Sequence, residues 1–471
     1  MLDLSIRGGT VVTDGGAFPA DLGIVHDKIE WVAQGGSLPA ARRELVAEGL
    51  LVLPGAIDIH VHVRAPGHAE RGTFETETRA AVAGGVTTVL EMPISTPCCA
   101  RREVLERRKA LGLSEAYSNF GLYGAPGLME RDEILGMAEA GACGFKVFTH
   151  APPPGREDEF LGLCIEGEDQ LYAALEMIKE TGLLTSCHAE NERLIRLFYG
   201  RMQATGRKDY AAFAESRPPV VEAMSVAQLV VLAEATGAHL HVAHVSGRWP
   251  LRVLQEGQRR GLILTGETCP HYLLFTKADS ARLGPFAQIK PPLRSEEDQQ
   301  ALWQGLADGS LVAITTDHSP FTLEEKQRGF EDIWKSPIGA PGVEALVPFV
   351  VGEAVQGRIT LEHAVSCIST GPARLFNLFP AKGAIQPGAD ADLVLYDPAD
   401  IGATDSSRWF TKARAIDRLY HGRPRYGSVD TTIVNGQVVF EKGKITVERG
   451  QGRFVRPNPS KPNSKSAAGR A

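Results

Sequence analysis

Residues 55–63 read GAIDIHVHV, an apolar run that ends in two histidines separated by one residue. A short apolar run bounded by glycine and proline is typical of a buried β-strand. Similar runs follow it: TTVLEMP (87–93), NFGLYGA (119–125), GFKVFTH (144–150), LLTSCHAE (183–190), HLHVAHVS (239–246), LILTGETCPHYLL (262–274) and LVAITTDHSP (311–320). Helical stretches such as 101–112 and 168–182 separate them. These β/α repeats predict an α/β fold with a closed (β/α)8 TIM barrel, although a doubly wound parallel sheet fits the same pattern.

Both chain ends outside these repeats are rich in short strands and turns. The strand-like stretches are 4–13, 20–34 and 43–55 near one end, and 382–398 and 431–445 near the other. Asn435-Gly436, between two apolar runs, is a strong hairpin signal. We therefore expect the ends, residues 1–53 plus 373–455, to form one small β-sandwich domain, with the barrel over 54–372 as an insert. The tail, 456–471, is rich in proline, serine and lysine and is expected to be disordered.

Composition and charge exclude several classes of function. The chain carries 50 Lys+Arg against 57 Asp+Glu, a net charge of −7, which lacks the basic excess that a nucleic-acid partner needs. The N-terminus has no basic segment followed by an apolar core, and no apolar run approaches about 18 residues, so we expect neither export nor a membrane span. The 7 cysteines form no CxxC pair and cannot all pair within the chain, which favours a cytoplasmic location.

Histidines and one aspartate stand at the ends of the strand-like runs. His60 and His62 share one face of their strand because side chains alternate with a period of two. His188, His244 and Asp317 end three further runs. The C-terminal ends of barrel strands meet at one face, where active sites lie. Imidazole and carboxylate ligands favour zinc, manganese, cobalt or iron over calcium or magnesium, so this pattern predicts a transition-metal site.

Lys146 stands in the fourth run, GFKVF. Two neighbouring dications would need an anion between them, and the sequence offers a lysine at this place instead. A buried, charged lysine without a partner is costly. From the residues alone, an ordinary lysine paired with a carboxylate is the simpler interpretation.

Taken together, the motifs resemble those of a known family. GAIDIHVHVRAPG, AVAGGVTTVLEMP, GFKVF, CHAEN, HVS, ETCPHYL and TTDHSP occur here in the order found in cyclic amidohydrolases: hydantoinases, allantoinases, dihydropyrimidinases and dihydroorotases. The resemblance runs from about residue 1 to 455. It implies a (β/α)8 barrel with a small β-sandwich made from both chain ends, a hydrolase acting on carbon–nitrogen bonds in cyclic amides, and a homodimer or homotetramer.

The resemblance also implies a metal centre. Lys146 would be N-carboxylated by CO2 and would bridge two divalent ions, zinc in the first place, with manganese or cobalt as alternatives. His60, His62, Lys146 and Asp317 would hold one ion, and Lys146, His188 and His244 the other. Asp317 would take the proton from the bridging water and return it to the departing ring nitrogen. The expected reaction is opening of a cyclic amide or ureide by a metal-bridging hydroxide.

The identity of the ring is less sharply specified. Arg64 stands where dihydroorotases carry an arginine that binds the substrate carboxylate. Ile94 and Phe321, however, replace the asparagine and the histidine that complete that carboxylate site. The loss of these polar contacts weighs strongly against dihydroorotate as the substrate. Other stretches resemble hydantoinases, such as FGLYGA (120–125), or allantoinases, such as DHSP (317–320). The combination favours a hydantoinase- or allantoinase-like enzyme, with dihydroorotase or dihydropyrimidinase as alternatives.

Three more residues are expected near a small-molecule substrate. Ala151 occupies the position of the oxyanion-binding tyrosine of many hydantoinases, so Thr149 or His150 would have to assist, unless the metals suffice. Lys290 lies on the loop after the seventh strand, where family members contact substrate; a solvated lysine is the alternative. A non-catalytic oligomeric scaffold, found among relatives that have lost the ligands, is disfavoured because every ligand position is occupied.

Overall fold

Parallel strands form a barrel in the computed structural model, which describes residues 1–35 and 38–458. The strands are β6 (Ala56–Val61), β7 (Val86–Glu91), β8 (Asn119–Gly124), β9 (Gly144–Phe148), β10 (Thr185–His188), β11 (Leu240–Val242), β12 (Leu264–Thr268) and β13 (Ala313–Ile314). Each pairs with the next in chain order. A parallel bridge between Val61 and His318 joins β6 to the segment after β13. The predicted (β/α)8 barrel is confirmed.

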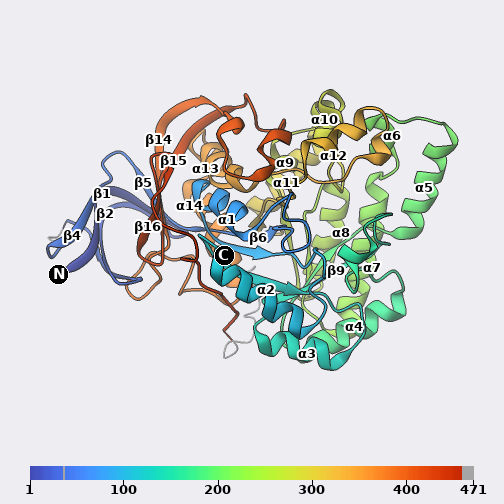
Figure 1. Ribbon diagram of the computed structural model, residues 1–471, viewed down its shortest axis with the longest axis horizontal. Helices are drawn as coiled ribbons and strands as arrows, with labels where there is room; N and C mark the ends of the chain where they lie inside the picture. Colours follow the sequence, from blue (N-terminus) through green and yellow to red (C-terminus); the bar gives the residue numbers. More distant parts are fainter. Residues whose placement is uncertain (36–37, 459–471) are drawn as a thin grey trace.

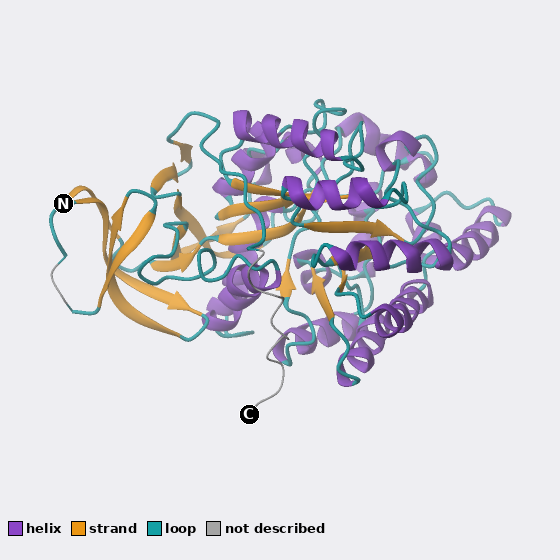
Figure 2. Ribbon diagram, turned by 90° about the horizontal axis from the view of Figure 1, so that it is seen from below, coloured by secondary structure: helices purple, strands orange, loops and turns teal. Residues whose placement is uncertain are grey.

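Helices cover the outside of this barrel (Figure 1 and Figure 2). The larger ones are α1 (Phe74–Ala83), α2 (Arg102–Glu115), α3 (Arg131–Ala140), α4 (Glu168–Glu180), α5 (Glu192–Ala204), α7 (Pro219–Thr236), α8 (Arg248–Arg259), α11 (Glu296–Ala307) and α13 (Leu346–Val355). Shorter ones are α6 (Tyr210–Glu215), α9 (Pro270–Leu274), α10 (Lys277–Leu283), α12 (Leu323–Gln327), α14 (Leu361–Val365) and α15 (Gly371–Leu375). In α4, Leu171, Ala174, Leu175 and Ile178 are buried at the three- and four-residue spacing of an amphipathic helix.

The register of the barrel strands brings the polar side chains to one end. Between β9 and β10, Lys146 lies opposite Ser186 and Phe148 lies opposite His188. Between β10 and β11, Cys187 lies opposite Val242, two residues before His244. Because all strands run in the same direction, the residues at and just beyond their C-terminal ends face a common space.

Strands from the two chain ends form a second sheet beside the barrel (Figure 1). They are β1 (Leu2–Thr13), β2 (Gly16–Val25), β3 (Lys28–Ala33), β4 (Ala41–Val46), β5 (Leu51–Pro54), β14 (Leu393–Ala403), β15 (Pro424–Val434), β16 (Gln437–Glu441) and β17 (Lys444–Ile445). The N-terminal strand β5 pairs antiparallel with the C-terminal strand β14, which joins the two ends into one mostly antiparallel sheet. Asn435 (φ 51°) and Gly436 (φ 78°) form the predicted hairpin turn between β15 and β16.

Gly55 links the small sheet directly to the barrel, between β5 and β6. A Cβ atom at this position would lie 2.1 Å from Oγ1 of Thr87 on β7, so only glycine fits here. The domain boundaries at 53/54 and 372/373 stay predictions. Most of the expected disordered tail, residues 459–471, lies outside the described residues.

Helix α7 is long and apolar, although no membrane span is expected from the sequence. Together with α6 it spans residues 210–236, which are long and apolar enough to cross a membrane by length and composition alone. However, 56% of the most apolar window is buried inside the protein. Val226, Leu229 and Val230 belong to the main hydrophobic core, which is the usual setting of such a helix in a globular barrel.

Candidate metal centre and substrate cavity

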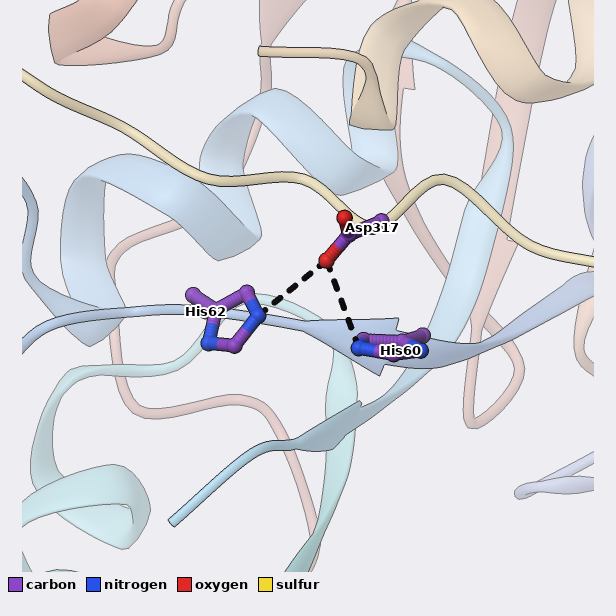
Figure 3. A group of neighbouring side chains, drawn as sticks. All are labelled: His60, His62 and Asp317. Carbon is purple, nitrogen blue, oxygen red and sulfur yellow. Dashed lines mark hydrogen bonds and ion pairs between the residues drawn. The ribbon is translucent and has the colours of Figure 1, made fainter. Parts of the chain in front are cut away.

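His60, His62 and Asp317 form a compact cluster at the end of the barrel (Figure 3). The Oδ1 atom of Asp317 lies 3.3 Å from Nε2 of His60 and 3.2 Å from Nε2 of His62. Figure 3 shows His60 on the strand β6 and His62 just beyond its end, with Asp317 reaching both from the segment that follows β13. Three donor atoms converge, as a metal ion requires.

His188 and His244 form a second pair. Nδ1 of His188 lies 2.9 Å from Nε2 of His244, and both side chains are buried. The ring centroids of His60 and His244 are 5.2 Å apart, so this pair adjoins the first cluster. The structure therefore brings the four predicted histidines and Asp317 together.

Buried carboxylates hold the outer nitrogen of two of these imidazoles. Oε1 of Glu267 lies 2.6 Å from Nδ1 of His60, and Oε2 of Glu190 lies 2.8 Å from Nε2 of His188. Burial opposes the charge on Glu190, but the neighbouring Arg217 keeps its pKa below the usual value. A carboxylate on one ring nitrogen fixes the tautomer that leaves the other nitrogen free to bind metal. The imidazoles are thus oriented as ligands.

Lys146 is fully buried beside this centre and forms no ion pair with a carboxylate of the described residues. Its Nζ reaches only Oγ of Ser186, at 3.5 Å. Burial lowers the pKa of its ammonium to about 8. An unpaired buried lysine is unfavourable as a cation but fits a carbamate, whose negative charge would suit two metal ions. The chain's residues therefore fit the implied binuclear group.

Three residues of the site have left-handed backbone conformations that are rare outside glycine. They are Arg64 (φ 73°), His244 (φ 38°) and Asp317 (φ 47°). Such conformations cost of the order of 1–3 kcal/mol each and persist where surrounding structure enforces them, often at functional sites. These three side chains are therefore placed at a cost in local backbone stability.

A cavity with about 390 Å³ of empty space, including its open mouth, lies over the cluster. Of the predicted site residues, His60, His62, His188, His244, Asp317, Arg64, Ile94 and Lys290 line it. Lys146, Thr149, His150 and Phe321 do not.

Arg64 is a buried cation in the cavity wall. Its Nη2 donates to Oγ of Ser319, while Nε and Nη1 have no hydrogen-bond partner. Its guanidinium carbon lies 4.8 Å from the ring centroid of Phe321. Burial lowers the pKa of Arg64 to about 9. Phe321, predicted as a substrate contact, instead packs beneath Arg64 and away from the cavity surface.

The hydroxyl of Thr149 is already occupied. It lies 3.0 Å from the carbonyl oxygens of His188 and Glu190 and 2.9 Å from Oγ of Ser225. His150 also has both ring nitrogens engaged, Nδ1 with the Ala151 carbonyl at 2.6 Å and Nε2 with Lys290 at 3.3 Å. We therefore do not assign either side chain to the substrate oxyanion, because both serve to hold the loop after β9.

Sequence reasoning missed several residues of the site. Glu267 and Glu190 orient the histidines, and Arg156 and Phe160 line the cavity. An acidic residue inside an otherwise apolar barrel strand, as in LTGET, is a signal that could have found Glu267. No comparable signal marks Arg156 and Phe160, which lie between β9 and α4, just before and within a short 3-10 helix (Glu157–Phe160).

A barrel with histidines and an aspartate gathered at its C-terminal strand ends is the architecture of the amidohydrolase family, and the chain belongs to this family, which it matches over residues 51–439. Members of the family typically depend on metal ions.

Several relatives align with this chain over nearly their whole length. The chain is 33% identical over 460 residues to the L-hydantoinase of Paenarthrobacter aurescens, covering 97% of this chain and 98% of that protein. It is 37% identical over 468 residues to the allantoinase of Rubrobacter xylanophilus, covering 98% of each. The solved structure of the L-hydantoinase (dihydropyrimidinase) from Arthrobacter aurescens matches with a TM-score of 0.92 and 32% identity, covering 97% of this chain and 100% of that one. The predicted resemblance to hydantoinases and allantoinases is confirmed.

Proposed function

We propose that this protein is a binuclear metal-dependent hydrolase that opens a cyclic ureide, of the hydantoin or allantoin kind. The observation that carries the proposal is the convergence of His60, His62, His188, His244 and Asp317 around the unpaired Lys146. The names of the relatives support the choice of ring.

The ligand set divides between two positions. His60, His62 and Asp317 would hold one ion and His188 and His244 the other, with Lys146 between them. Zinc is the first candidate, and manganese or cobalt the alternatives, since imidazole and carboxylate suit all three. When bound, the ions lower the pKa of a shared water so that hydroxide is available to attack the ring carbonyl.

Lys146 would supply the negative charge between the ions, and Asp317 would transfer the proton. The Lys146 amine, once deprotonated, would form an N–C bond with CO2 and release a proton, and the resulting carbamate would supply an anion for the two ions. Asp317 accepts the proton of the attacking water and returns it to the ring nitrogen as the C–N bond breaks. That transfer matters because an amide nitrogen is a poor leaving group as an anion.

Dihydroorotase remains a second candidate because of one observation. Nε and Nη1 of Arg64 are buried without a partner at the cavity, as a carboxylate-binding arginine would be. Ile94, which also lines the cavity, offers no hydrogen bond to complete a carboxylate site.

Metal analysis and a substrate panel test the proposal together. Protein purified without chelator should contain close to two transition-metal ions per chain, and its mass under native conditions should show carboxylated Lys146. The panel compares 5-substituted hydantoins of each hand, allantoin, dihydrouracil and dihydroorotate by kcat/KM. We expect a hydantoin or allantoin to lead. Absence of metal together with absence of ring opening would reject the proposal, and a clear preference for dihydroorotate would reject the choice of ring.

We also propose that the chain assembles as a homodimer or homotetramer. None of the residues of α5 is buried, and Leu197 and Tyr199 on this helix are exposed. Exposed apolar side chains on a helix that has no buried residue are typical of an interface. Light scattering of the wild type should give a multiple of 50.7 kDa, and Leu197→Asp should lower it if α5 forms the contact.

A further inference from the structure

Lys290 lies in the wall of the cavity on the loop between α10 and α11. Its side chain is half-buried, and it forms no ion pair with a carboxylate of the described residues. Arg156, in contrast, is paired with Glu159 at 2.7 and 2.6 Å. Lys290 thus faces the cavity without a neutralising anion, and burial lowers the pKa of its ammonium to about 7. An uncompensated charge in such a position costs free energy, which a ligand would recover.

His150 fixes where the ammonium of Lys290 points. Nδ1 of His150 lies 2.6 Å from the carbonyl oxygen of Ala151, so Nδ1 carries the hydrogen and Nε2 is an acceptor. Nζ of Lys290 lies 3.3 Å from that Nε2 and donates to it. One N–H is thereby used, and an ammonium group has three. The remaining hydrogens are available to a substrate.

Aromatic rings place this ammonium beside the second histidine pair. Nζ of Lys290 is 5.4 Å from the ring centroid of Phe148 and 5.9 Å from that of Phe160. Phe148 in turn stacks on His188, with centroids 4.5 Å apart and planes at 7°. Arg64 instead contacts Ser319 and Phe321, which lie on the segment that follows β13 and carries Asp317. The two unpaired cations therefore belong to different walls of the cavity, and Lys290 is the one beside His188.

Few other groups near His188 are free to stabilise an oxyanion. The hydroxyl of Thr149 is engaged by two carbonyls and a serine, and residue 151 is alanine. We infer that Lys290 donates to the carbonyl oxygen of the scissile amide and stabilises the negative charge that develops there. The inference rests on the proposed ring-opening function, since it names a further catalytic residue for that reaction.

The electron balance of this step is simple. The hydroxide oxygen forms a bond to the ring carbonyl carbon, and the C=O π electrons move onto the oxygen, where the Lys290 ammonium faces them. When the tetrahedral centre collapses, those electrons re-form the carbonyl and the C–N bond breaks. The nitrogen receives its proton from Asp317. Lys290 gives up no proton and regains its starting state.

Two uncharged variants and one charged variant test the assignment. Lys290→Met removes the charge and the donor, Lys290→Gln keeps an N–H for His150 but removes the charge, and Lys290→Arg keeps a cation. Loss of one preorganised oxyanion donor typically lowers kcat about 10²- to 10³-fold. We expect that loss in both uncharged variants on every ring the wild type opens, and a smaller loss in Lys290→Arg. Lys335→Met, at an exposed lysine, should leave kcat unchanged.

Three further readouts keep the outcomes apart. Metal content and thermal midpoint, measured for each variant, exclude loss of the fold or of the metal centre. Inhibition by the ring-opened carboxylate product should weaken about tenfold in Lys290→Gln, because the product carries the same oxygen.

A KM effect confined to rings with a carboxylate substituent would overturn the assignment, since Lys290 would then bind a substituent. Uncharged variants within threefold of an active wild type would also overturn it. A wild type inactive on all rings would instead refute the proposed function, and the inference with it.

Discussion

Glu267 and His60 are joined by a short buried contact, with 2.6 Å between Oε1 of the carboxylate and Nδ1 of the imidazole. The other carboxylate oxygen lies 3.2 Å from Nε2 of His241, so Glu267 sits between two histidines. Burial works against the charge of Glu267, but the adjacent His60 and His241 outweigh it and hold its pKa below the usual range. Glu267 therefore stays ionised and fixes the proton of His60 on Nδ1, which leaves Nε2 for the metal.

The first prediction follows from this contact. Glu267→Gln removes the charge and allows the amide to present either its oxygen or its nitrogen to His60. Loss of such an outer carboxylate typically weakens metal binding about 10- to 100-fold. Competition with a chelator, followed by metal analysis, measures the change. Glu222→Gln is the matched control, because Glu222 is equally buried, hydrogen-bonds to Ser246 and touches no ligand histidine. Equal metal affinity in both variants would contradict the assigned role of Glu267.

Asp317 is expected to act both as ligand and as proton carrier. Asp317→Asn keeps an oxygen that can face His60 and His62 but cannot accept a proton. Since general acid–base groups contribute roughly 10²- to 10⁴-fold, we expect kcat to fall within that range while the fold persists. Activity and metal content are measured on the same preparation. Retained ring opening at the wild-type rate would show that another group moves the proton.

Lys146 offers a test of the carbamate. Lys146→Ala removes the side chain that is proposed to bridge the two ions and should lower the metal content and abolish activity. A small carboxylate such as formate fits the space left by the side chain and supplies the missing bridging anion. Added formate should therefore restore part of both metal binding and activity, in proportion to its concentration. No rescue, with the fold intact by circular dichroism, would argue that the lysine is structural.

Much of this architecture could be predicted from sequence because the barrel repeats a local rule. Each apolar run ends at the same face, so His60, His62 and Asp317 could be brought together before any coordinates were known. The family resemblance likewise predicts that Arg64, Ile94 and Lys290 lie near the substrate. All of these line the cavity in the structure.

Loop conformation was not predictable in the same way. The sequence indicates that Thr149 and Phe321 lie near the site, but not that the hydroxyl of Thr149 is engaged by its neighbours or that Phe321 packs under Arg64. These contacts depend on backbone conformation beyond the strand ends, where no periodicity applies. Glu159 was missed for the same reason, since its partners Arg71 and Arg156 come from two different loops.

Glu159 provides a prediction for acid stability. Burial opposes its charge, but hydrogen bonds from Arg156 and the charges of Arg64 and Arg71 outweigh burial and lower its pKa to about 2, from 4.5. A carboxylate with a depressed pKa in the folded state stabilises that state above its unfolded pKa, by about 3 kcal/mol here. This contribution is fully present above about pH 4.5 and is lost as the pH falls towards 2. Glu159→Gln should therefore lower the free energy of unfolding at pH 7, and the difference from wild type should shrink across that acid range. Urea unfolding of both metal-free proteins from pH 7 to pH 2 measures it, with Asp158→Asn, at an exposed neighbour, as the control. A difference that stays constant down to pH 2 would mean that Glu159 acts through packing and not through its charge.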